Sequence, residues 1–224
     1  MVSAKVLFTD NGKPITVDKI RLLLHEFKGS YEDATNNIIV ISQKLDKEGK
    51  VFRVCADRIL KNYGMTRVGV FHGDNREAVL DKCWDKIGDD LLDIRKTINA
   101  SNRSRDRYLL EIGEVKRKKL IDEIWQMTKA ILPFTMSASS YGLVGASKIL
   151  FSVLPEIVLP VDNTQWMQVF KTVDLGDVIR FMADDIQRWE DATGEQFNLL
   201  DPSKRLTTLP AVYNVVAMDA RDKI

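Results

Sequence analysis

Two side chains that could do chemistry, Lys148 and Asp162, each stand near the expected start of a helix. Lys148 follows a glycine-punctuated turn, and Asp162 comes after a proline and before a second helix, fourteen residues later. A lysine that is desolvated beside a helix N-terminus has a lowered pKa and becomes nucleophilic. A carboxylate can stabilise positive charge that develops on a reacting carbon, and it can orient or deprotonate a water. Lys148 and Asp162 are therefore the candidate catalytic side chains.

The segments around these two residues have a characteristic order. Residues 141–150 read Tyr-Gly-Leu-Val-Gly-Ala-Ser-Lys-Ile-Leu, and residues 159–166 read Leu-Pro-Val-Asp-Asn-Thr-Gln-Trp. Over about residues 138–170, this order resembles the end of the helix-hairpin-helix, Gly/Pro…Asp domain of base-excision DNA glycosylases. In that family a Leu-x-Gly-x-Gly hairpin grips the DNA backbone, and the aspartate of a Pro-Val-Asp sequence sits at the reaction centre.

The resemblance implies a role for each of these residues. Asp162 would stabilise the oxocarbenium-like sugar as the base–sugar bond breaks, and it would activate a water. Lys148 would be the amine that forms a Schiff base with the sugar in enzymes that also have lyase activity. The hairpin glycines would let backbone N–H groups approach a DNA phosphate at a helix N-terminus, and Trp166 would contact the base. The expected DNA-binding residues are Gly142, Val144, Gly145, Ser147, Asn163, Gln165 and Trp166.

Two other functions stay open. The net charge is only +1, from 33 Lys and Arg residues against 32 Asp and Glu residues, and Lys148 stands one position later than the lysine of the family. These features favour a DNA-binding or regulatory protein that keeps the fold without catalysis. The third interpretation is a helical protein-interaction module, such as a phage or host-defence component. Duplex DNA is the expected partner in the first two cases.

Composition narrows the class of protein. Hydrophobic residues make up 45% of the chain, which is enough for a sizeable core. No apolar run approaches the roughly 20 residues that span a bilayer, and the N-terminus lacks the apolar core of a signal peptide. We therefore expect a cytoplasmic protein without a membrane partner.

The two cysteines and two histidines indicate little metal chemistry. Cys55 and Cys83 form no Cys-x-x-Cys pair, and two histidines are too few for a histidine-rich site, so we expect buried thiols, no metal site and no cofactor. The oligomeric state is left open.

Hydrophobic periodicity predicts a mainly α fold: a helix-hairpin-helix glycosylase-like bundle with a small N-terminal β-hairpin or α/β element. Residues 1–72 would form the N-terminal element and residues 73–224 the helical domain, unless the two are one continuous domain. Short strands are expected within residues 5–16 and at 66–71, and the run at 38–41 is ambiguous between strand and helix. Helices are expected up to residue 27, at 53–63, from 74 to a loop at 100–104, at 105–131, 144–154, 163–171, 175–191 and from about 208.

Several other residues have alternative interpretations. Arg103, Arg105 and Arg107, together with the basic run at 116–119, could form a phosphate-binding stripe, although interspersed acidic residues favour a solvated helix face. Pro133 is expected to end the long helix. The tryptophans at helical spacing are expected mainly in the core. Tyr213 and Asn214 of the last helix could return to the site, although simple packing is the favoured interpretation.

Overall fold

The computed structural model describes residues 6–27, 30–67, 69–136, 142–163 and 165–222. The described residues are mainly α-helical, which confirms the predicted class. The α-helices are α1 (Val17–Glu26), α2 (Ser30–Ile41), α3 (Lys50–Asn62), α4 (Asn75–Asn99), the single turn α5 (Tyr108–Glu111), α6 (Glu114–Thr135), α7 (Leu143–Val153), α8 (Leu175–Thr193) and α9 (Leu209–Asp222). Short 3₁₀ turns are η1 (Ser42–Lys44), η2 (Met65–Arg67), η3 (Gly69–Phe71), η4 (Arg105–Arg107) and η6 (Phe197–Leu199), and η5 (Gln165–Phe170) is a π-helix.

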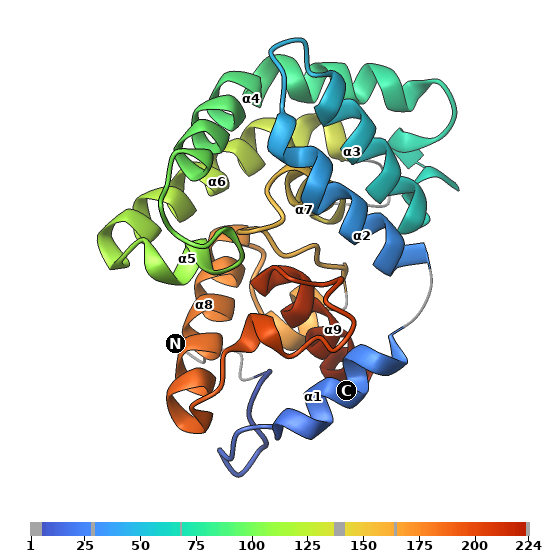
Figure 1. Cartoon of the computed structure of the whole chain (residues 1–224). Coiled ribbons are helices and arrows are strands. Elements are labelled where there is room, and N and C mark those ends of the chain that lie inside the picture. The colour runs from blue at the N-terminus through green and yellow to red at the C-terminus, as the bar shows by residue number, and fades with distance from the viewer. Residues whose placement is uncertain (1–5, 28–29, 68, 137–141, 164, 223–224) are drawn as a thin grey trace.

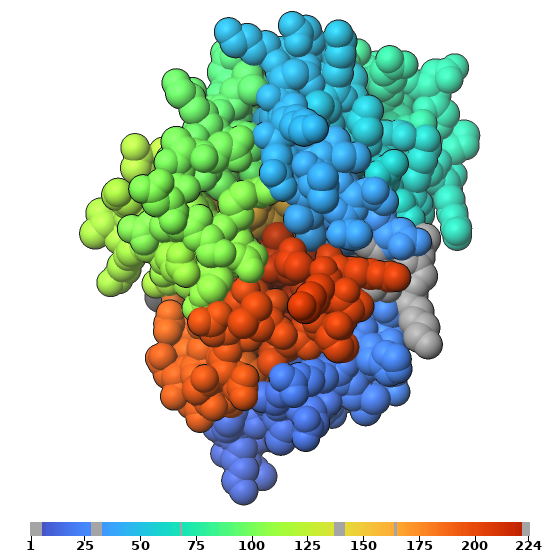
Figure 2. All heavy atoms as spheres, viewed as in Figure 1, coloured from blue at the N-terminus to red at the C-terminus, as the bar shows by residue number. Residues whose placement is uncertain are grey.

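The helices form two groups around a shared core (Figure 1). In the upper group of that view, α7 packs against α2, α3 and α6, and α4 packs against α3 and α6. The lower group contains α8, α9 and α1, and α1 packs against α9 although the two lie at opposite ends of the chain. In the space-filling view the C-terminal segment lies between α1 and α2 (Figure 2). Helices from the first 72 residues therefore share their core with the rest of the chain.

The expected pair of strands in residues 5–16 is reduced to one antiparallel bridge, between Phe8 and Pro14. The turn itself forms, because the Thr9 N–H donates to the Lys13 carbonyl over 2.8 Å and Gly12 takes a φ of 73°. The ladder stops there for two reasons. Pro14 has no N–H to donate, and the Thr16 hydroxyl already caps α1 by accepting from the Lys19 N–H. The prediction of a strand-containing N-terminal element is thus not confirmed.

Two apolar runs with strand-like composition are helical. Residues 38–41 end α2, and the described residues of the stretch expected as a strand at 66–71 lie in η2 and η3, with residue 68 outside the described residues. In α2, Ala34 and Ile38 are one turn apart and both buried, whereas Val40 is 58% exposed. This is helical periodicity, and packing against α3 and α7 outweighs the β propensity of the run.

The segment expected as one helix at 105–131 forms several shorter elements, and its last helix ends later than expected. It is divided at Gly113, which has a φ of 80° and precedes α6. At its other end α6 continues through Pro133 to Thr135. Pro133 is exposed and lies in the last turn. A proline there removes one N–H donor from the helix. The turn is still closed, because the Met136 N–H donates to the Leu132 carbonyl. The prediction that Pro133 ends the helix was wrong by a few residues.

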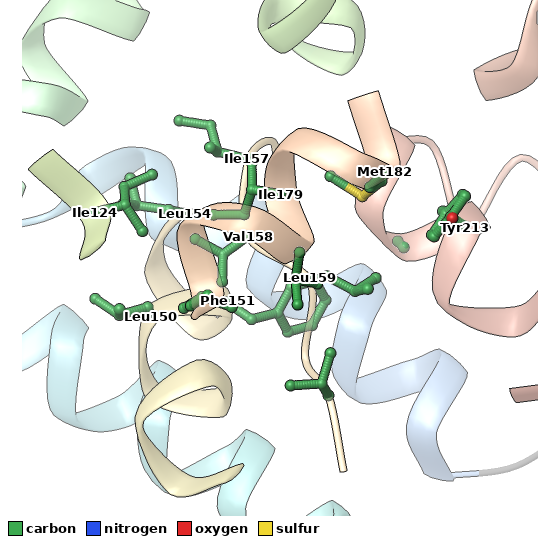
Figure 3. Close-up of a cluster of buried hydrophobic side chains, with 14 of the residues drawn as sticks. Ile124, Leu150, Phe151, Leu154, Ile157, Val158, Leu159, Ile179, Met182 and Tyr213 are labelled. Carbon is green, nitrogen blue, oxygen red and sulfur yellow. The ribbon is translucent and has the colours of Figure 1, made fainter. Parts of the chain in front are cut away.

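The segment that joins α7 to the region of Asp162 runs through the interior, and we call residues 154–161 the buried connection. Its apolar side chains have no exposed surface. They pack among side chains of α6, α7, α8 and α9, such as Ile124, Phe151, Ile179 and Tyr213 (Figure 3). Loops normally lie at the surface, because buried backbone polar groups need partners. The two prolines of the connection remove two N–H groups from that requirement.

A buried ion-pair cluster ties the connection to α4. Glu156 is fully buried, and Arg95 of α4 donates to its two carboxylate oxygens over 2.7 and 3.1 Å. Arg105 donates to the same carboxylate, and Arg95 also donates to the Val153 carbonyl at the end of α7. Burial lowers the pKa of both guanidinium groups to about 10, so both stay charged at neutral pH.

This arrangement corrects the interpretation of two of the three arginines before α5. Arg105 donates to Glu156, and Arg107 donates to Glu190 of α8 through two bonds of 2.6 and 2.8 Å. These two side chains form internal ion pairs, so they belong neither to a phosphate-binding stripe nor to a solvated face. Arg103 donates to the carbonyl of Glu111 and is exposed, as is most of the basic run at 116–119, which agrees with a solvated face there.

Replacing Glu156 by glutamine should destabilise the fold strongly. The substitution keeps the shape but leaves Arg95 buried without its counter-charge, and such losses cost about 3–5 kcal/mol. Urea unfolding of the wild type and E156Q measures the difference. The matched control is E123Q, because Glu123 forms an exposed pair with Lys119, and its substitution should change stability by less than about 0.5 kcal/mol. Equal stability of E156Q and wild type would contradict the account of the cluster.

Candidate active site

Gly142 links the start of α7 to the end of α6. This residue has a φ of 78°, a left-handed conformation that suits glycine, and it immediately precedes α7. A Cβ atom there would lie 2.7 Å from Thr135 Oγ1. The same hydroxyl donates to the Gly142 carbonyl over 2.9 Å, so the end of α6 and the start of α7 are held together. Residues 137–141, which belong to the expected hairpin, lie outside the described residues.

Gly145, in the first turn of α7, is in close contact with Phe71 of η3. A Cβ atom there would lie 2.7 Å from Phe71 Cε2, so the missing side chain makes room for the ring. The neighbouring side chains Val144 and Ser147 are buried as well. The start of α7 is therefore packed on this side, and contact of these residues with a DNA phosphate stays a prediction.

Lys148 lies in the middle of α7, with only 2% of its surface exposed. Its Nζ atom donates to the Val161 carbonyl over 2.9 Å and stands 4.5 Å from the centroid of the Tyr63 ring. Burial lowers the pKa of this amine to about 7, although the Asp162 carboxylate acts in the opposite direction. A substantial fraction of the amine is thus neutral near pH 7. The lowered pKa expected from the sequence is present, and its main cause is burial in the core.

Asp162 directly follows Val161, whose carbonyl accepts the hydrogen bond from Lys148. Asp162 also forms a reciprocal cap with Gln165. The Gln165 N–H donates to Asp162 Oδ1 over 2.8 Å, and the Asp162 N–H donates to Gln165 Oε1 over 2.9 Å. Such a capping box satisfies two backbone donors at the start of a helical segment, here η5. Asp162 is partly exposed, whereas Gln165 is buried. The chain thus leaves the interior at Asp162 with a fixed carboxylate.

The residues after Asp162 divide into exposed and buried members. Asn163 is exposed, but Trp166 is only 3% exposed, and its indole N–H has no hydrogen-bond partner in the part of the chain that the structure describes. Gln165 Nε2 donates to Asn214 Oδ1 of α9 over 3.4 Å, so Asn214 does reach the site. Tyr213 instead donates to Asp185, within the lower group of helices.

Other chemistry is less well supported by the described residues. They contain no group of three or more His, Cys, Asp and Glu side chains placed to hold a metal ion. Cys55 and Cys83 are buried free thiols, as expected, and burial raises the pKa of each to about 12. Across the described ranges, no helix combines the length and the apolar character needed to cross a membrane. A groove of about 600 Å³ lies away from Lys148, between α4 and α6.

Comparison of the chain with protein-family models, with curated proteins and with solved structures gave no match. The functional argument therefore rests on the geometry of this site. The structure brings Lys148 and Asp162 together at the Val161 backbone and adds Tyr63 and Asn214 to their surroundings. From the sequence, Tyr63 is expected only as the end of a helix, because no local pattern connects residue 63 with residue 148.

Replacing Gly145 by alanine should destabilise the protein by about 1–3 kcal/mol, the usual cost of overpacking a core. The added methyl group would collide with the Phe71 ring, as the 2.7 Å separation shows. A double-mutant cycle with Phe71→Leu, measured by urea unfolding, isolates this contact. We expect G145A to be less damaging in the F71L background than in the wild type. Additive effects of the two substitutions would show that the ring is not the obstacle.

The stability difference between wild type and Lys148→Met should depend on pH. The folded-state pKa of about 7 lies below the ordinary value of 10.5, so between these values the unfolded chain binds more protons. Unfolding free energy then rises with pH, by up to about 1.4 kcal/mol per pH unit, and K148M lacks this contribution. Urea unfolding from pH 7 to pH 9 should show wild type gaining stability relative to K148M. A constant difference would mean that Lys148 titrates as an ordinary lysine.

Proposed function

We propose that this protein binds duplex DNA and cleaves a base–sugar N-glycosidic bond, with Asp162 as the carboxylate at the reaction centre. The observation that carries the proposal is the meeting of Lys148 and Asp162 at Val161, after a glycine turn between two packed helices. A lysine of lowered pKa beside a fixed, partly exposed carboxylate is an arrangement typical of functional sites. It also follows the order of residues in the helix-hairpin-helix glycosylases.

The proposed reaction is a hydrolysis. The bond between sugar C1′ and the base nitrogen breaks, and its electron pair leaves with the base, which takes up a proton. Positive charge develops on the sugar, and the Asp162 carboxylate stabilises it. A water adds its oxygen to C1′ and gives a proton to Asp162, which releases it to solvent. In the resting arrangement the Lys148 amine is bound to the Val161 carbonyl, where it fixes the backbone that carries Asp162.

The surroundings of Asp162 provide groups for contact with DNA. Asn163 and Gln168 are exposed, and so is Lys171, which follows η5 with a φ of 52°. Met167 is 75% exposed on η5, and apolar side chains of this kind can enter a base step. Trp166 is buried, so we propose that it forms part of the wall behind the site and is not a stacking platform.

A DNA-binding protein without catalysis is the second candidate, and two contacts favour it. Asp162 Oδ1 already accepts the hydrogen bond of the cap, and Lys148 already satisfies a buried carbonyl. Both residues thus have a complete structural reason to be present. On this alternative the same surface would bind DNA, and no base would be released.

Asp162→Asn should abolish base release while DNA binding is retained. Asparagine is as good an N-cap as aspartate, so the substitution removes the charge and keeps the start of η5. We expect the rate to fall at least about 100-fold, as when a group that stabilises transition-state charge is lost. End-labelled duplexes with different modified bases, resolved with and without alkali, measure the cleavage, and gel shift measures the binding. Asp184→Asn, on the exposed side of α8, is the matched control and should behave as wild type.

The possible outcomes separate the candidate functions. Full activity of D162N would remove the proposed mechanism. A salt-sensitive gel shift without cleavage of any duplex would establish the non-catalytic DNA-binding protein. Absence of binding even at low salt would exclude both nucleic-acid functions and favour a protein-interaction module. A protein–DNA adduct trapped by borohydride would show that the Lys148 amine also reaches the sugar, provided that K148M abolishes the adduct.

A further inference from the structure

Tyr63 stands at the C-terminal end of α3, directly beside Lys148. Its N–H donates to the Ile59 carbonyl over 3.0 Å, which completes the last turn of the helix, and Gly64 follows with a φ of 68°. α3 packs closely along α7, and the Tyr63 ring lies 4.5 Å from Lys148 Nζ, measured to the ring centroid. Tyr63 is partly buried, whereas Lys148 is almost fully buried. The ring therefore lies against the amine at the end of α3, with its hydroxyl oxygen buried and another part of the side chain exposed.

The contact with the Tyr63 ring affects the charge of Lys148 as well as the access of reagents to its amine. The face of an aromatic ring carries partial negative charge and attracts an ammonium group, most strongly where water is excluded. Desolvation favours the neutral amine. In this site the ring, the Val161 carbonyl and the Asp162 carboxylate all favour the charged form, so they oppose the effect of burial.

We propose that the Tyr63 ring is a removable cover over Lys148, which shields the amine and favours its ammonium form, bound to the Val161 carbonyl. The inference deepens the proposed function and rests on it for its biological role, because it describes how an amine beside Asp162 is kept unreactive until the cover moves. The assignment of Tyr63 as the cover does not itself require DNA.

Of the described groups that contact the amine, Tyr63 is the one that stands at the end of a helix. Lys148 is fixed in the middle of α7, and Val161 belongs to the buried connection, which the Arg95–Glu156 pair anchors to α4. Tyr63 stands at a helix end, next to a left-handed glycine and before the short turn η2. A change at Gly64 would move the ring aside while leaving the contacts of α3 with α7 in place.

Reductive labelling tests the cover without DNA. A small aldehyde condenses with the amine to give an imine and water, and cyanoborohydride then reduces the imine by transfer of a hydride. Peptide mass spectrometry follows the label on Lys148 in wild type, Tyr63→Leu and Tyr63→Phe. Because Y63L removes the ring, it should label Lys148 at least about tenfold faster, whereas Y63F keeps an aromatic face and should stay close to wild type. Lys129 is the internal control, since it lies over Trp125 but is exposed, and its labelling should not change.

The pH dependence of labelling separates a positioning role from simple shielding. Loss of the ring should lower the apparent pKa of Lys148 in Y63L but not in Y63F, while Asp162 is present in every variant. Equal Lys148 labelling in wild type and Y63L, or wild-type Lys148 labelling as fast as Lys129, would overturn the proposal. If circular dichroism shows that Y63L does not fold, Tyr63→Met fills the space without a ring and should label quickly, and Tyr63→Trp should label more slowly than wild type.

Failure of this inference can be distinguished from failure of the proposed function. Fast labelling in Y63L combined with no base release from any duplex would support the cover and reject the glycosylase. Base release that depends on Asp162, combined with equal labelling of Lys148 in wild type and Y63L, would support the glycosylase and reject the cover.

Discussion

Irregular backbone inside a protein has to find partners for its carbonyl groups without help from water. Here the buried connection at residues 154–161 imposes that requirement, and cationic side chains bind one carbonyl just before it and one at its last residue. Arg95 donates to the Val153 carbonyl where α7 ends, and Lys148 donates to the Val161 carbonyl just before Asp162. Glu156 balances Arg95 and also binds Arg105. The packing of α4 against the centre and the exit point of the chain at Asp162 both depend on these contacts.

This constraint gives the candidate site its chemical character. Lys148 is buried because it serves the connection, and burial is the main reason for its lowered pKa. Asp162 stands where the chain reaches the surface, and its cap with Gln165 fixes the carboxylate in place. Lys148 thus supports the buried connection, Asp162 caps η5, and the two residues also form the candidate reactive pair. The proposed base release would use the carboxylate that this scaffold presents, while the amine stays under Tyr63 in the resting state.

Local patterns predicted much of the helical fold, and they failed where distant contacts decide the outcome. The ends of α3 and α8 follow from Gly64 and Gly194, because a left-handed glycine is a local signal for the end of a helix. The helix over residues 38–41 does not follow in this way, since packing on α3 and α7 overrides the β-branched composition. The first expected strand pair failed because Pro14 and the cap at Thr16 leave room for a single bridge.

The candidate site shows the same division. The glycine turn, the lysine and the capping aspartate are visible within residues 138–170. The partner of Gly145 is Phe71, the partner of Glu156 is Arg95, and the cover of Lys148 is Tyr63, each more than 55 residues away along the chain. Arg105 and Arg107 resemble surface charges in the sequence because their partners Glu156 and Glu190 are 51 and 83 residues away. No periodicity or motif in one sequence identifies such pairs, because they exist only in the packed state.

The most direct test of this account is an NMR titration of the Lys148 side chain with isotope-labelled lysine, in which the signal is assigned by its absence from K148M. The account predicts a titration midpoint near 7, because burial of the amine lowers its pKa by more than the Asp162 carboxylate raises it. A midpoint near the ordinary lysine value of 10.5 would contradict it, since burial would then not be the dominant influence on the pKa of Lys148.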